Sequence, residues 1–157
     1  MAHEVTLHRR ITAPPEAVWE VLTDLDQAAR RLSQVTEMHV MTDGPYAIGT
    51  RWRETRRMMG SSDTQEMVVV DNDPLRRTVL EAVDGSTTYR TVLVLESLDG
   101  SAATLLTLSF SAEVTDPTRL QRLALQVVGP LGLKLTERSL RTELDDIARA
   151  AEQLHRG

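Results

Sequence analysis

Alternating apolar and polar residues open the chain, and a helical spacing of apolar residues follows directly. The alternation predicts a strand over residues 3–11. Pro14 and Pro15 are typical of a helix start, where their missing N–H groups cost nothing. The next apolar positions recur three and four residues apart and form one stripe: Val18, Val21, Leu22 and Leu25. Asp24 suits the cap of a second short helix over residues 28–32.

Six further strands are predicted between residues 36 and 114, each bounded by turn signals rich in Gly, Pro, Asn or Asp. The last strand alternates clearly: Leu106, Leu108 and Phe110 share one face, and polar residues occupy the other. One dry face and one solvated face are typical of an antiparallel sheet. The six strands cover residues 36–42, 50–59, 64–71, 76–83, 87–98 and 103–114.

After Asp116-Pro117 the apolar spacing becomes helical again. Gly129-Pro130 divides this region, because proline inside a helix removes a hydrogen bond and clashes with the preceding turn. We therefore expect a separate short helix over residues 120–128, able to move as a lid. A terminal helix of more than twenty residues follows it.

The order of these elements predicts an α+β fold in one domain, residues 1–157. A sheet with one apolar face needs a cover, and only the terminal helix is long enough to provide it. We expect a curved seven-stranded antiparallel sheet wrapped around that helix, with the two short helices after the first strand closing one end. The space between sheet and helix is either filled by side chains or left as a pocket.

Composition and charge narrow the function classes. The chain has 157 residues, a net charge of −5 and no cysteine, which disfavours nucleic-acid binding and excludes disulfides and thiolate chemistry. No apolar run approaches the roughly 20 residues of a membrane helix, and the N-terminus has no secretory pattern. The four histidines have no metal-binding spacing, and no phosphate-loop or dinucleotide motif occurs. We expect a cytoplasmic monomer or homodimer without metal or cofactor.

The sequence resembles the START-like, Bet v 1-like superfamily, which includes SRPBCC and polyketide cyclase/dehydratase-like proteins. The resemblance covers nearly the whole chain and implies the helix-grip fold. Members include lipid and sterol carriers, hormone receptors, aromatase/cyclases and ring-hydroxylase subunits, so fold alone does not decide the function. The residues that carry it are ITAPPEAVWEVLTD (11–24), IGTRWRETRRMMG (48–60), DPLRRTVLEA (73–82), TTYRTVLVLE (87–96) and LRTELDDIARAAE (140–152).

A ligand site is predicted on the inner face of the sheet and the first half of the terminal helix. Alternation along the strands selects the inward positions, which are mostly aliphatic with a few polar groups to orient a ligand. The predicted ligand-binding residues are Trp52, Glu54, Met67, Val69, Tyr89, Leu93, Leu95, Leu106, Leu108, Phe110, Leu131 and Leu135.

The polar residues of this set leave three interpretations open. Glu54, Arg56 and Tyr89 are candidates for acid–base catalysis, since a carboxyl group in an apolar pocket can act as a general acid or base. Alternatively, Arg56 pairs with Glu54 and holds it ionised. In the third interpretation Arg56 forms an ordinary cross-strand ion pair with Glu66 or Glu81, and the charges are solvated at the rim.

Because no dedicated acid–base pair is visible, a binding module leads. Its expected ligand is a small hydrophobic or amphipathic molecule of the lipid, polyketide or isoprenoid type. The alternatives are a polyketide cyclase/dehydratase-type enzyme that uses the same cavity, and an interaction protein whose cavity is vestigial.

Overall fold

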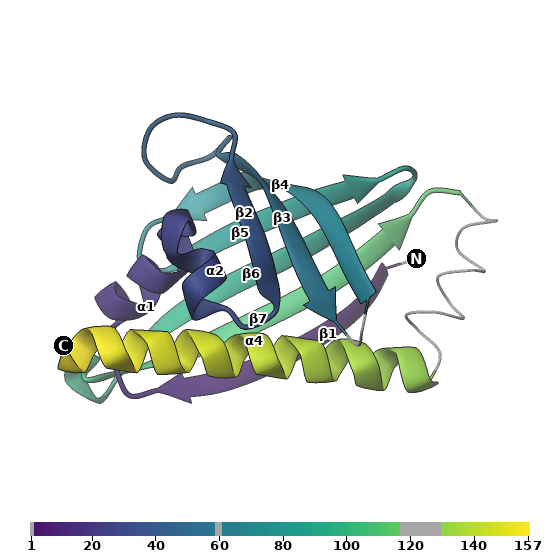
Figure 1. The fold of residues 1–157 in the computed structure, drawn as a ribbon. Coiled ribbons are helices and arrows are strands. Elements are labelled where there is room, and N and C mark those ends of the chain that lie inside the picture. Colours follow the sequence, from purple (N-terminus) through teal and green to yellow (C-terminus); the bar gives the residue numbers. More distant parts are fainter. Residues whose placement is uncertain (1, 59–60, 117–129) are drawn as a thin grey trace.

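Seven antiparallel strands form one curved sheet in the computed structural model, which describes residues 2–58, 61–116 and 130–157 (Figure 1). The spatial order is β1-β7-β6-β5-β4-β3-β2, so only β1 and β7 are neighbours that are distant in sequence. This arrangement confirms the predicted α+β helix-grip fold. The strands are β1 (Ala2–Ile11), β2 (Val35–Val40), β3 (Arg51–Met58), β4 (Ser61–Asp73), β5 (Arg77–Asp84), β6 (Thr87–Leu98) and β7 (Ala103–Val114).

The two short helices lie where the sequence predicts them, between β1 and β2. Helix α1 (Pro15–Thr23) has proline in its first turn, and the 3₁₀ turn η1 (Leu25–Gln27) leads into α2 (Ala28–Arg31). The prediction that the Asp24 side chain caps the second helix was wrong. That side chain makes no capping hydrogen bond, and its carboxylate instead lies 3.7 Å from a guanidinium nitrogen of Arg31.

The terminal helix α4 (Pro130–Arg156) crosses the open side of the sheet and packs against α1 and β1 (Figure 1). Small residues on its second half permit this close packing: Ala148 and Ala151 are fully buried beside Ile11 and Leu106. The described part of the helix starts at Pro130, so the residues before the predicted break at Gly129-Pro130 are not described. The predicted lid, residues 120–128, lies outside the described residues.

Strand bounds agree best where the residue pattern is strongest. The β6–β7 hairpin has its predicted bounds, and the short 3₁₀ turn η2 (Asp99–Ser101) joins its strands. Strand β4 is longer than predicted at both ends, because its polar start from Ser61 pairs with β3 although it shows no alternation. The register between β4 and β5 shifts between Val69 and Asp71.

Buried hydrogen bonds attach the N-terminal helical region to the rest of the fold. The carboxylate of Asp146, only 4% exposed, accepts from the backbone N–H of Ser33 at 2.8 Å and from its hydroxyl at 2.6 Å. Before α1, the Thr104 hydroxyl donates to the carbonyl of Ala13 at 2.8 Å. These contacts fix the helices that close one end of the sheet.

Candidate functional site

A cavity of about 360 Å³ lies between the concave face of the sheet, the short helices and α4. Its volume falls in the range of small-molecule pockets, roughly 300–1,000 Å³. Most of its wall is apolar. The short helical region supplies Val21, Leu22, Leu25, Ala28 and Leu32, and α4 supplies Leu140 and Ile147.

Strand alternation brings many of the predicted site residues to this cavity. Seven of the twelve predicted ligand-binding residues line it, and so does Arg56. The seven are Trp52, Glu54, Met67, Tyr89, Leu93, Leu108 and Phe110.

Other predicted residues lie elsewhere. Val69, Leu95 and Leu106 face inward and are buried, but they are not part of the cavity wall. Alternation identifies the inner face of a strand, but not how far along the strand the space stays open. Leu95 and Leu106 lie opposite each other in the hydrophobic core that α1 and the second half of α4 fill. Leu135 is half-buried outside the wall, and the side chain of Leu131 lies outside the described residues.

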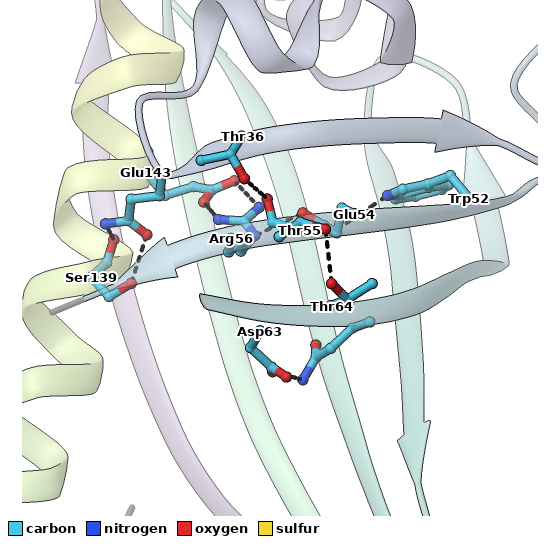
Figure 2. Close-up of polar contacts among 11 residues, drawn as sticks. Thr36, Trp52, Glu54, Thr55, Arg56, Asp63, Thr64, Ser139 and Glu143 are labelled. Carbon is cyan, nitrogen blue, oxygen red and sulfur yellow. Dashed lines mark hydrogen bonds and ion pairs between the residues drawn. The ribbon is translucent and has the colours of Figure 1, made fainter. Parts of the chain in front are cut away.

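Three charged side chains form a connected group at the cavity. The Arg56 Nε donates to Glu54 Oε2 at 2.7 Å, and its two terminal nitrogens donate to the two carboxylate oxygens of Glu143 on α4 (Figure 2). The Nη2–Oε1 distance is 3.0 Å. Arg56 therefore joins the sheet to the terminal helix through two carboxylates.

Glu54 is held from two sides. It is 5% exposed, and besides Arg56 it accepts a hydrogen bond from the indole Nε1 of Trp52 at 3.3 Å. Burial acts to lower the pKa of Arg56, but the carboxylates of Glu143 and Glu54 together outweigh it and raise that pKa above its ordinary value. The guanidinium thus stays charged at any ordinary pH.

The solvated cross-strand ion pair was the wrong interpretation. Glu66 pairs with Arg51 at 3.1 Å and Glu81 with Arg90 at 2.9 Å, both among partly exposed side chains. The side chain of Arg56 is only 26% exposed and turns inward instead. The pairing of Arg56 with Glu54 is the interpretation that matches the structure.

The wall changes from apolar to polar along β3 and β4. Trp52 lies opposite Met67, the next inward position pairs Glu54 with Gln65, and the one after pairs Arg56 with Asp63. On α4 the two wall residues nearest the N-terminus, Thr136 and Ser139, are polar, and the charged Glu143 lies between Leu140 and Ile147. The cavity therefore has an apolar end and a polar end.

Ser139 also holds the polar end in place. Its hydroxyl donates to the side-chain oxygen of Gln34 at 2.8 Å, and the Gln34 amide donates to the Ser139 carbonyl at 3.3 Å. Gln34 follows Ser33, so two neighbouring residues between α2 and β2 both hydrogen-bond to α4.

Trp52 belongs to a cluster of three aromatic side chains, with Tyr46 and Trp19. The ring of Tyr46, from the loop before β3, lies 6.3 Å from that of Trp19 and 6.4 Å from that of Trp52. Its hydroxyl is 2.7 Å from the buried Thr78 hydroxyl. Burial raises the pKa of Tyr46 to about 12, although the Thr78 hydrogen bond acts in the opposite direction.

Sequence reasoning missed Glu143 and Tyr46. Glu143 had a usable signal, because it lies three residues after Leu140 and four before Ile147 and so belongs to the inward stripe of α4. Tyr46 had none, since it lies in a loop without periodicity.

Neither a metal-binding cluster nor a helix able to span a membrane occurs among the described residues. No group of three or more His, Cys, Asp or Glu side chains there is arranged to hold a metal ion. No helix in that part of the chain combines the length and apolarity needed to cross a membrane.

Comparisons with solved structures agree on the fold. TTHA0849 from Thermus thermophilus is 22% identical with a TM-score of 0.77, over 97% of this chain and 99% of that one. The Zhui aromatase/cyclase from Streptomyces sp. R1128 is 17% identical with a TM-score of 0.77, over 98% and 95% of the two chains. A START superfamily protein from Mycobacterium smegmatis is 16% identical with a TM-score of 0.75, over 97% and 99%.

Sequence comparison identifies the family. No curated protein matches the chain. A family model described as polyketide cyclase / dehydrase and lipid transport matches residues 2–152, which include every described strand and nearly all of α4. The resemblance to START-like and Bet v 1-like proteins is thereby confirmed, and the chain belongs to the polyketide cyclase/dehydrase and lipid transport family.

Proposed function

We propose that the protein binds a small amphipathic ligand of the lipid, polyketide or isoprenoid type in its internal cavity. The apolar part of the ligand lies among the aliphatic residues near Leu93 and Ile147. Its polar group lies beside Glu54, Arg56 and Glu143. The observation that carries this proposal is the polarity gradient along one continuous cavity wall.

The geometry favours binding over acid–base catalysis. Both oxygens of Glu54 accept hydrogen bonds, from Trp52 and from Arg56. Arg56 donates to two carboxylates and stays charged. A general base has to take up the substrate proton, and a proton on Glu54 would cancel its charge and weaken the ion pair with Arg56. These residues are better suited to orient a polar group than to exchange protons with it.

A pair of tryptophan substitutions tests whether the cavity is used. Leu108 and Leu106 lie two residues apart on the same face of β7 and are 2% and 0% exposed, but only Leu108 lines the cavity. We expect Leu108→Trp to fill the cavity, abolish ligand binding and change the melting temperature little. Leu106→Trp is the matched control, and we expect it to overpack solid core and cost about 1–3 kcal/mol.

Binding is measured by titration with a panel of lipids, polyketides and isoprenoids, read by thermal shift and by mass spectrometry of bound and converted compounds. Saturable binding that Leu108→Trp removes supports the proposal. If Leu108→Trp destabilises the protein as much as Leu106→Trp and no compound binds, the cavity is vestigial. Turnover of a bound compound that Glu54→Gln abolishes would establish an enzyme instead.

A further inference from the structure

We propose that the polar group of the ligand is a cation, such as an amine, and that the cavity discriminates against carboxylates. This inference rests on the proposed binding function and specifies its ligand class. Among the described residues that line the cavity, one side chain is basic, Arg56, and three are acidic: Glu54, Asp63 and Glu143. Counted at formal charges, these four described side chains sum to 1 − 3 = −2.

The contacts of Arg56 explain why its positive charge does not attract an anion. Glu143 accepts hydrogen bonds from both terminal nitrogens in a bidentate pair, and Glu54 accepts one from the Nε. Bidentate pairs of this kind are the strong form of a charge-assisted hydrogen bond. One cation is thus matched by two anions, so an incoming carboxylate meets net negative charge in a partly dry space, where electrostatic repulsion exceeds that in water.

The two glutamates keep the capacity to accept further donors. A carboxylate oxygen has about two acceptor positions, and each oxygen of Glu54 and Glu143 uses one in the contacts described. An ammonium group has three N–H donors and no acceptor. It therefore complements a site in which acceptors are in excess.

Aromatic rings in the same wall add a second attraction for a cation. Trp52, Tyr89 and Phe110 all line the cavity, and the last two are stacked with ring centroids 6.0 Å apart. Ring faces attract ammonium groups and have no comparable attraction for carboxylates. Trp52 also donates to Glu54, so an aromatic ring of the wall lies directly beside a carboxylate.

The experiment compares three unbranched ligands with ten carbon atoms each: decylamine, 1-decanol and decanoate. At pH 7 an alkyl amine is protonated and a fatty acid is ionised, so the three head groups are cationic, neutral and anionic. Dissociation constants are measured by calorimetry below the aggregation concentration of each compound. We expect decylamine to bind about tenfold more tightly than decanol, equivalent to about 1.4 kcal/mol, and decanoate to bind most weakly.

Single-charge variants locate the effect. Glu54→Gln and Glu143→Gln should each reduce the ratio of amine to alcohol affinity, and a ratio measured within one variant is insensitive to a general loss of stability. Glu66→Gln is the matched control, because it removes the same charge from the part of β4 that pairs with β3 but outside the cavity wall. It should leave the ratio unchanged.

The outcomes separate the two proposals. If decanol binds in the cavity but decylamine binds no more tightly, or if decanoate binds best, the inferred cationic head group is wrong and the binding function stands. If none of the three compounds and no member of the wider panel binds, the binding function itself is wrong, and this inference fails with it. A ratio that Glu66→Gln lowers as much as Glu54→Gln does would also overturn the inference.

Discussion

Arg56 on β3 and Glu143 on α4 meet across the cavity, with Nη2 3.0 Å from Oε1. They are 87 residues apart in sequence and join the sheet directly to the helix that covers it. The same guanidinium holds Glu54, so one side chain neutralises charge on two elements. The contact is both part of the cavity wall and part of what holds the fold closed.

Replacing Arg56 with methionine should be strongly destabilising. The substitution keeps much of the side-chain volume but leaves the buried Glu54 and its neighbour Glu143 without their cation, and breaking a buried pair costs up to about 3–5 kcal/mol. Urea denaturation measures the loss. The double variant Glu54→Gln with Arg56→Met should lose less than Arg56→Met alone, because it removes the stranded charge. Equal losses in the two variants would contradict the argument.

The Ser33–Asp146 contact predicts a local effect on dynamics. In Asp146→Ala the Ser33 N–H loses its acceptor, so its hydrogen exchange should accelerate. The free energy of unfolding should fall by about 1.5–3 kcal/mol, the usual contribution of hydrogen bonds to a charged group. Asp146→Asn keeps an acceptor oxygen and should lose less in both measurements. Unchanged exchange at Ser33 in the alanine variant would show that another group protects this amide.

The two tryptophans differ in position, so tryptophan fluorescence should report ligand binding. Trp52 lines the cavity, whereas Trp19 packs edge-on against Tyr46 and is not part of the wall. We expect a ligand from the panel to change tryptophan fluorescence in the wild type and in Trp19→Phe. In Trp52→Phe the fluorescence change should disappear, with binding followed separately by calorimetry. A signal that instead depends on Trp19 would place the ligand outside the cavity.

Tyr46 predicts a stability loss at alkaline pH. Its phenol has a pKa of about 12 in the folded state, against 10.0 when unperturbed. Between these two pH values the unfolded chain has released the Tyr46 proton and the folded chain retains it. The contribution of Tyr46 to the free energy of unfolding is therefore fully present below pH 10 and is lost as the pH rises to about 12.

The variant Tyr46→Phe should show a shallower decline of the free energy of unfolding over this pH window than the wild type. At neutral pH it should lose about 0.5–1.5 kcal/mol with the Thr78 hydrogen bond. Thr78→Val is the control, since it breaks the same hydrogen bond but keeps the phenol. Parallel pH curves for wild type and Tyr46→Phe would refute the assignment.

Strand faces were predictable because side chains alternate strictly. Alternation placed Trp52, Glu54 and Arg56 on one face of β3, but it left open whether the two charged side chains lie inside or are solvated at the rim. The partner of Arg56 was not predictable from β3 alone, since it comes from a helix far along the chain. The exposed pairs that local reasoning suggested, with Glu66 or Glu81, are instead satisfied by Arg51 and Arg90.

The extent of the cavity was harder to predict than its face. Leu106 and Leu108 have the same residue type, strand and orientation, yet only Leu108 borders open space. The difference arises because α1 and the alanines of α4 fill the end near Leu106. Such packing depends on three-dimensional contacts between distant segments, which the period of a single strand does not contain.

The first half of α4 borders the cavity and the second half is buried in the core, which has a consequence for how this protein can evolve. Thr136, Ser139 and Glu143 line the cavity, whereas Ala148 and Ala151 are fully enclosed in the core two turns later. We expect substitutions at Thr136 and Ser139 to alter which compounds the cavity accepts while the fold persists, whereas larger side chains at Ala148 and Ala151 do not fit the core. A mutant library restricted to Thr136 and Ser139, which keeps the Arg56–Glu143 pair, should therefore yield many folded members with divergent ligand preferences.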